Sequence, residues 1–203
     1  MAIRGNITKE ILKRNKIKLN ENVVLCDPGL LLSRLYMPTD PIEKKYKIGI
    51  IAHYTDEATI RRKYGNDYHV ISMDTNDMEA LAREILACEI ILSSSLHGII
   101  FAHSYGIPAY HIQFKDFFNN GNFKFADYYS AFNGLIYRKF KELPSTNNKL
   151  DFDKILKFHE KHCKDANPTR EQIREKQDDF LKVLPYRKYL LVKYGGQWGK
   201  PTV

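Results

Sequence analysis

The segment "EIILSSSLHGIIFAHSYG" (residues 89–106) joins two apolar runs through three serines and a histidine. A short apolar run bounded by turn residues is typical of a buried strand, and the longer run after the serines has the length of a helix. That helix has to end near Gly106, because Pro108 cannot continue it. The segment therefore predicts a strand over 89–94, a polar turn, and a helix over 96–106.

The same alternation runs through the first two thirds of the chain. Periodic apolar positions behind polar caps predict helices over 56–65 and 75–89. Four further β-rich runs, apolar nearly throughout as strands covered on both faces are, lie at 22–27, 46–53, 68–74 and 108–114. Repeated strand–helix–strand units imply right-handed crossovers and predict an α/β fold with a Rossmann-like, mostly parallel sheet flanked by helices.

In this fold, the serine-rich turn lies at a position where ligands bind. Open parallel sheets bind ligands just beyond the carboxyl ends of their strands, where the turn lies. It is also a helix start, whose free N–H groups and positive dipole end attract an anion such as a phosphate or carboxylate. The alternative is that Ser94 or Ser95 only caps the helix and that His97 is a satisfied first-turn histidine.

Composition narrows the class of protein. The chain has 203 residues, 43% of them hydrophobic, and it lacks an apolar run long enough for a membrane span or a signal peptide. Three scattered cysteines favour free thiols over a disulfide frame or a zinc site. We therefore expect a cytoplasmic protein. The formal charge of +8 is compatible with nucleic acid, an anionic membrane or phosphorylated metabolites, although no nucleic-acid reader motif is present.

Several motifs together resemble the polysaccharide pyruvyl transferase family over roughly residues 2–133. They follow one another in the family's order and are "IRGNIT" (3–8), "CDPGLLL" (26–32), "IGIIAHYTD" (48–56), "ILSSSLHGIIFAHSYGIPA" (91–109) and "FKFADYY" (123–129). The resemblance implies one lobe of a two-lobed fold similar to the GT-B glycosyltransferases. It also implies transfer of the pyruvyl group of phosphoenolpyruvate onto two hydroxyls of one sugar, with formation of a ketal and release of phosphate. The acceptor is expected to be a cell-surface polysaccharide or its precursor, possibly lipid-linked, and no metal or cofactor is required.

This chemistry selects candidate residues from the matched motifs. The doubly anionic donor calls for cations and a helix start, and the proton transfers call for a general acid and a general base. We expect His97, and next His53, to be catalytic. The substrate-binding candidates are Arg4, Ser93, Ser94, Ser95, Gly98, Lys124 and Asp127. Asp27 is interpreted as a turn former, and His103 and His111 as core or sheet-edge residues without a catalytic role.

Two departures from the family leave alternatives open. Some relatives have arginine at the position of Ser95, and the family's first lobe is expected before Arg4 but is not seen. The chain is then a transferase completed by a partner lobe or a homo-oligomer, a catalytically silent fragment or binding module, or, more weakly, a glycosyltransferase lobe.

The C-terminal part is predicted to be an extension of the lobe. We place the lobe at residues 1–135 and a basic, mainly helical extension at 136–203, with helices over 151–165 and 167–184. The second helix carries Ile173, Phe180, Leu181 and Leu184 on one stripe. This stripe favours packing against the sheet over docking on anionic lipid at the inner face of the membrane.

Overall fold

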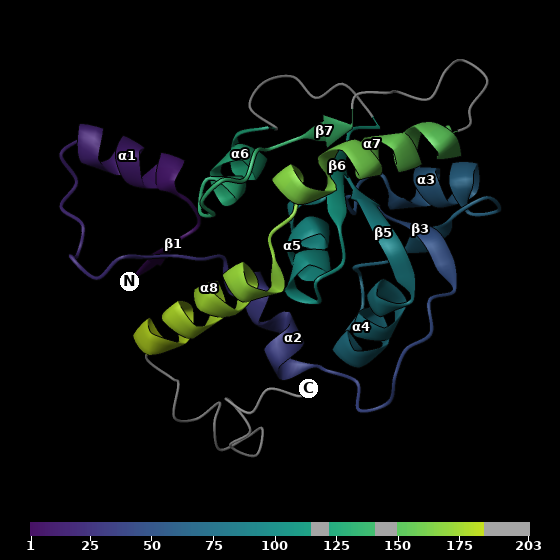
Figure 1. The fold of residues 1–203 in the computed structure, drawn as a ribbon, viewed down its shortest axis with the longest axis horizontal. Helices are drawn as coiled ribbons and strands as arrows, with labels where there is room; N and C mark the ends of the chain where they lie inside the picture. Colours follow the sequence, from purple (N-terminus) through teal and green to yellow (C-terminus); the bar gives the residue numbers. More distant parts are fainter. Residues whose placement is uncertain (115–121, 141–149, 185–203) are drawn as a thin grey trace.

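The computed structural model describes residues 1–114, 122–140 and 150–184, and its centre is a five-stranded parallel sheet (Figure 1). The strands lie in the order β4-β3-β5-β6-β7, and every neighbouring pair is parallel. Their bounds are Tyr46–Ile51 (β3), His69–Ile71 (β4), Cys88–Ser93 (β5), Ala109–Ile112 (β6) and Lys139–Phe140 (β7). The predicted parallel α/β fold is confirmed.

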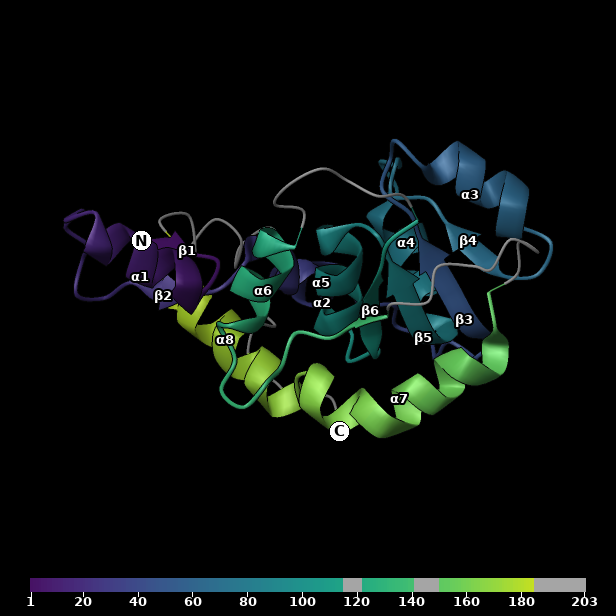
Figure 2. The same cartoon turned by 90° about the horizontal axis from the view of Figure 1, so that it is seen from above.

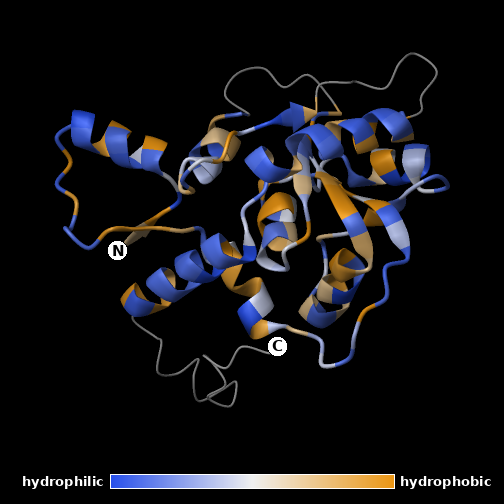
Figure 3. Cartoon of the chain, viewed as in Figure 1, coloured by the Kyte–Doolittle hydropathy of each residue, from blue (hydrophilic) through white to orange (hydrophobic). Residues whose placement is uncertain are grey.

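Helices cover both faces of this sheet because both faces are apolar. One face packs against α4 (Met78–Leu86) and α5 (Leu96–Ser104), and α8 (Arg170–Val183) extends the same core cluster through β2 (Val24–Leu25) and η1 (Pro28–Leu31). The other packs against α3 (Glu57–Tyr64) and α7 (Phe152–Ala166). Figure 3 shows the contrast at α5, which is largely in hydrophobic colours, and α8, whose visible surface is mostly hydrophilic. The result is a three-layer αβα arrangement.

The order of the strands creates a switch point between β3 and β5. From β3 the chain crosses through α3 to β4 on one side, and then through α4 to β5 on the other side of β3. The two crossover helices pack on opposite faces of the sheet. The carboxyl ends of β3 and β5, where Ile51 pairs with Ser93, therefore flank the crevice at which doubly wound sheets bind ligands.

The local signals in the sequence locate the helices well. Asp77 caps α4 by accepting a hydrogen bond from the N–H of Ala80. Helix α5 ends at Ser104, two residues before Gly106, whose φ of 71° is the left-handed conformation that glycine adopts at low cost. Both helices lie within the predicted ranges.

The predicted strand over 22–27 is corrected by the structure. Only Val24–Leu25 (β2) is extended, and it pairs with Ala2–Ile3 (β1) in a separate two-stranded sheet. Between them lies α1 (Asn6–Arg14), which contains no buried residue and stands at the far side of α6 (Phe123–Tyr129) from the main sheet (Figure 1). The apolar pattern of 22–27 was real, but its partner is the start of the chain.

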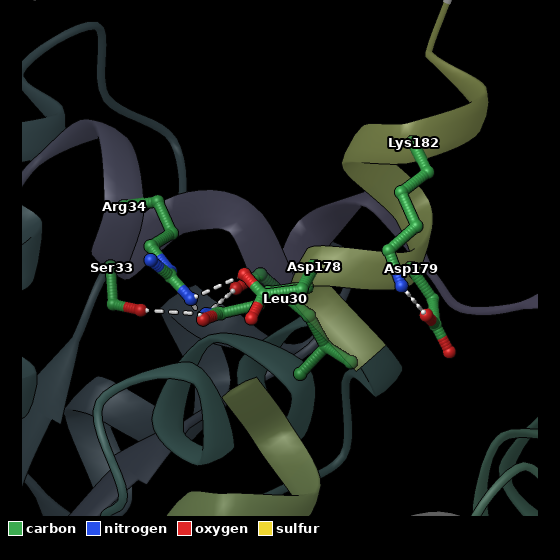
Figure 4. A network of polar contacts seen from close by, with 7 residues as sticks. Leu30, Ser33, Arg34, Asp178, Asp179 and Lys182 are labelled. Carbon is green, nitrogen blue, oxygen red and sulfur yellow. Dashed lines mark hydrogen bonds and ion pairs between the residues drawn. The ribbon is translucent and has the colours of Figure 1, made fainter. Parts of the chain in front are cut away.

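A short 3₁₀ helix, η1 (Pro28–Leu31), and α2 (Leu32–Leu35) follow β2 and pack on α5 and α8. Gln177 of α8 is the polar centre of this contact: its amide donates to the Leu30 carbonyl oxygen at 2.7 Å and to Ser33 Oγ at 3.0 Å. Arg34 donates to Gln177 Oε1 at 2.7 Å and to Asp178 at 2.8 Å (Figure 4). A buried amide with all these partners fixes where α8 lies.

Of the C-terminal helices, α7 packs directly on the sheet, where Phe158 meets Tyr110 of β6 and Phe140 of β7, whereas α8 packs on β2 and η1. They follow each other along one long side of the molecule (Figure 2). Ile173, Phe180 and Leu181 are buried in the same cluster as α5, and Leu184 packs against it. Within the described residues, no helix is both long enough and apolar enough to cross a bilayer.

Candidate functional site

The serine-rich turn at the switch point is held by Ser93. This side chain is fully buried, and its hydroxyl donates to the carbonyl oxygen of Ile51 at 2.7 Å or that of Ser95 at 2.8 Å. It also accepts from the N–H of Ser95 at 3.0 Å. Ser93 therefore ties the end of β5 to the end of β3, and its hydroxyl is used inside the protein.

His53 is joined to the same turn from the β3 side. Its backbone N–H donates to Ser94 Oγ at 2.9 Å, and its half-buried ring lies 2.9 Å, Nδ1 to Oγ1, from Thr55. The structure therefore places His53 and the turn before His97 at the neighbouring ends of β3 and β5.

Neither Ser94 nor Ser95 caps α5 with its side chain. Ser95 occupies the N-cap position in an extended conformation, yet its hydroxyl makes no capping hydrogen bond. The first N–H groups of a helix have no partner within the helix. His97, the second helical residue, is exposed, with its ring 5.9 Å from that of Phe101. The start of α5 thus offers backbone donors, a hydroxyl and an imidazole.

Gly98 allows α5 to begin this close to the sheet. A Cβ at this position would lie 2.3 Å from Ser93 Oγ and 2.7 Å from Ile51 Cγ2, distances that real atoms do not adopt. Any larger residue has to push the first turn of α5 away from β3 and β5. Gly98 therefore sets the position of the N–H groups in the first turn of α5.

Arg4 is held by Asp27, in the turn that packs on α5. The Arg4 Nε donates to Asp27 Oδ2 at 3.0 Å, and Asp27 Oδ1 accepts from the N–H of Gly29 at 2.9 Å. Asp27 is 4% exposed, whereas the Arg4 side chain is 35% exposed. A Cβ on Gly29 would lie 3.1 Å from the Phe101 ring, which in turn neighbours His97. Asp27 and Gly29 thus connect Arg4 to the side of α5 that carries Ile100 and Phe101.

Lys124, from α6, is the second cation near Arg4. Burial, and next the positive charge of Arg4, lower the pKa of Lys124 below its usual range. Its ammonium lies 5.4 Å from the centre of the Phe125 ring. Because the positive charges of Arg4 and Lys124 repel each other, an anion bound between them would offset the repulsion.

Asp127 is placed differently from the expectation of a ligand contact. It is 1% exposed, and both carboxylate oxygens accept hydrogen bonds at 2.7 Å, from the N–H and from the hydroxyl of Thr8. Gly5 fits against it so closely that a Cβ there would lie 1.7 Å from the Asp127 carbonyl oxygen. Asp127 therefore caps α1 from α6 and holds the Arg4 segment in place.

The two histidines interpreted as core residues are core residues. His103 is 2% exposed and lies 3.0 Å from the Tyr128 hydroxyl and 3.1 Å from Asn167 Oδ1, while burial lowers its pKa to about 4. His111 is stacked on Phe125, and burial, with the charges of Lys139 and Lys124, lowers its pKa to about 3. Both imidazoles are neutral packing groups near neutral pH.

Sequence reasoning missed the roles of Asp27 and Phe101. Asp27 was interpreted only as a turn former, and it does form that turn, but its second oxygen also orients Arg4. The available signal was an acidic residue in one motif and a basic residue in another. Across the described ranges, no group of three His, Cys, Asp or Glu side chains is arranged to hold a metal ion.

Comparisons with known proteins identify the family of the chain. A family profile described as polysaccharide pyruvyl transferase matches residues 2–115, more than half of the chain and the part that carries the switch point, Arg4 and α5. Uncharacterized protein L143 of Acanthamoeba polyphaga mimivirus is 37% identical over 135 residues, which are 64% of this chain and 47% of that protein. The chain thus spans about half the length of this curated relative. No solved structure matches the chain. The chain belongs to the polysaccharide pyruvyl transferase family.

Proposed function

We propose that the chain binds phosphoenolpyruvate at the start of α5 and takes part in pyruvyl transfer to a saccharide. The donor carries a phosphate and a carboxylate. The uncapped amides of α5 and the hydroxyl of Ser95 suit one anionic group, and Arg4 with Lys124 suits the other. Because Arg4 already uses Nε on Asp27, its outer nitrogens are the ones assigned to the ligand.

The protons of the reaction balance with two histidines in reach of the crevice. The two sugar hydroxyls that attack C2 of the donor lose two protons. The methylene carbon gains one and becomes a methyl group, and the departing phosphate takes the other. We assign proton donation to the methylene carbon to His97, because it stands exposed among the anion-binding groups. We assign removal of a hydroxyl proton to His53, across the switch point.

The remaining candidate residues are assigned to positioning. Ser94 holds the backbone of His53, and Ser93 and Gly98 set the distance between α5 and the ends of β3 and β5. Asp127 acts through Thr8 on the segment that carries Arg4. Each of these residues supports a binding group without itself needing to touch the donor.

The observation that carries the proposal is the exposed His97 on an uncapped helix start at the switch point of a family member. A phosphate some 4 Å from an imidazolium is worth about 4 kcal/mol at an effective dielectric of 20, which exceeds the opposing helix dipole of about 0.3 to 1 kcal/mol. Donor binding and protonation of the acid are therefore mutually supportive.

The test measures binding and turnover separately. Phosphoenolpyruvate binding is followed by calorimetry, and phosphate release is followed with and without a galactoside acceptor. We expect Arg4→Gln to weaken donor binding, His97→Asn to abolish acceptor-dependent phosphate release, and Arg14→Gln, an exposed change at the other end of α1, to alter neither.

Each outcome has a defined meaning. Donor binding without phosphate release supports the alternative of a catalytically silent binding module, or of an enzyme completed by a partner lobe. Absence of phosphoenolpyruvate binding contradicts the proposal. Binding of a nucleotide sugar in competition with phosphoenolpyruvate supports a glycosyltransferase lobe instead.

A further inference from the structure

A second group of basic residues lies at the β7 edge of the sheet and does not include the residues assigned to the donor. Strand β7 forms the edge of the sheet, and α7 packs beside it (Figure 1). Between them is an open groove of about 580 Å³. It is lined on one side by residues 137–140 and on the other by Lys154, Lys157, Phe158 and His162. None of the donor-site candidates is among these residues.

The groove has an excess of positive charge. Four of its eight lining residues are lysine or arginine, and none is acidic. Arg138 is compensated by Asp165 at 2.7 Å, and Lys154 Nζ lies 3.8 Å from a carboxylate oxygen of Asp151. Lys139 bonds to the neutral amide of Gln113.

Within the described ranges, two of these lysines have no compensating carboxylate. In the described parts of the chain, neither Lys139 nor Lys157 forms an ion pair, and Lys157 is exposed. Lysine acts as a point charge that suits phosphate. Two such charges match the dianion of a phosphate monoester.

The volume and the lining of the groove suit a ligand that is larger than an inorganic anion. Its volume lies within the range of roughly 300 to 1,000 Å³ that is usual for small-molecule sites. Phe140 and Phe158 meet edge to face at 5.3 Å and give the groove an apolar wall, to which Tyr137 adds a ring with a polar end. A ligand with an organic body and a phosphate group fits this combination.

We propose that the groove between β7 and α7 binds a phosphorylated saccharide, with the phosphate held by Lys139 and Lys157. The sugar lies against the aromatic wall of Phe140 and Phe158, beside the His162 ring, while the Tyr137 hydroxyl stays bonded to His111 and Asn122. The site does not depend on pyruvyl transfer, because it shares no residue with the donor site.

Calorimetry on the whole chain at low salt tests this with glucose 1-phosphate as the probe. We expect Lys157→Gln and Lys139→Gln each to weaken its binding about tenfold, since each removes one charge-assisted hydrogen bond. The matched control is Lys161→Gln, an exposed lysine one turn further along α7 and outside the groove, which should leave the affinity unchanged. Glucose and inorganic phosphate, used alone, should both bind more weakly than glucose 1-phosphate.

Several results would overturn the inference. Unchanged affinity in the Lys139→Gln Lys157→Gln double variant would exclude the two lysines as the phosphate site. Equal binding of glucose would remove the role of the phosphate, and equal binding of inorganic phosphate would remove the role of the sugar. A loss of glucose 1-phosphate binding in Arg4→Gln, with none in the double variant, would place the probe in the donor site instead. Failure of phosphoenolpyruvate to bind would refute the donor site and leave this inference standing.

Discussion

Gly98→Ala tests whether the close approach of α5 to the sheet positions the candidate site. A new Cβ would lie 2.3 Å from Ser93 Oγ and 2.7 Å from Ile51 Cγ2. Both neighbours are fully buried, so neither has open space to move into. Overpacking of this kind destabilises a protein by about 1 to 3 kcal/mol.

Loss of the Ser93 hydrogen bonds adds to the destabilisation by Gly98→Ala. Rotating its hydroxyl away from the new methyl group breaks contacts at 2.7 to 3.0 Å with Ile51 and Ser95, each worth about 0.5 to 1.5 kcal/mol. Replacing glycine by alanine inside a helix gains about 1 kcal/mol. The losses exceed this gain, and we expect the free energy of unfolding to fall by about 2 to 4 kcal/mol.

Urea unfolding followed by circular dichroism measures the change, with an unaltered m-value showing that the unfolded state is the same. The matched comparison is a double-mutant cycle with Ser93→Ala, which removes the nearer of the two clashing atoms. We expect the double variant to be more stable than the sum of the two single losses predicts. If Gly98→Ala is as stable as the wild type, α5 moves away from the strands at no cost, and the reasoning about its position is refuted.

Three further predictions concern residues that hold the fold together. Asp127→Asn should speed hydrogen exchange of the α1 amides, with a local loss of stability of about 1 to 2 kcal/mol, because its NH₂ group replaces one of the two oxygens that accept from Thr8. Asp178→Asn, at a partly exposed ion pair with Arg34, should leave α1 exchange unchanged, and equal effects of the two variants would contradict the capping role of Asp127. The free energy of unfolding should fall by about 3 kcal/mol as the pH drops from about 6.5 to about 4, because the unfolded chain protonates His103 while burial keeps the folded imidazole neutral down to its pKa of about 4. His111 adds to this loss in the same direction. A His103→Gln variant whose unfolding free energy has the same pH slope as the wild type would refute the assignment. Gln177→Ala should lower the free energy of unfolding by about 2 to 3 kcal/mol, because it leaves the Leu30 carbonyl and Arg34 Nε without their partner. Lys182→Ala, at an exposed ion pair on the same helix, should change this free energy by less than about 1 kcal/mol. Similar losses in both variants would contradict the anchoring role of the Gln177 amide.

The sequence by itself determined the alternation of strands and helices and the place of the serine-rich turn. These features are local: an apolar run, a cap such as Asp77 and a terminating Gly106 lie within one or two turns of what they control. The sequence also identified Ser95 and His97 at the start of a helix that follows a buried strand. In open parallel sheets ligands bind at the switch point beyond the carboxyl ends of the strands, which made this turn the candidate site.

The tertiary structure alone decided which distant segments meet. It paired residues 24–25 with the start of the chain instead of the main sheet, and it made Lys139–Phe140 the edge strand, although two residues are too few to give a strand pattern in the sequence. It joined Arg4 to Asp27 and assigned Asp127 to the cap of α1, 119 residues from Thr8. Such contacts depend on shape and charge complementarity between surfaces that only the folded chain brings together, so no pattern within one segment predicts them.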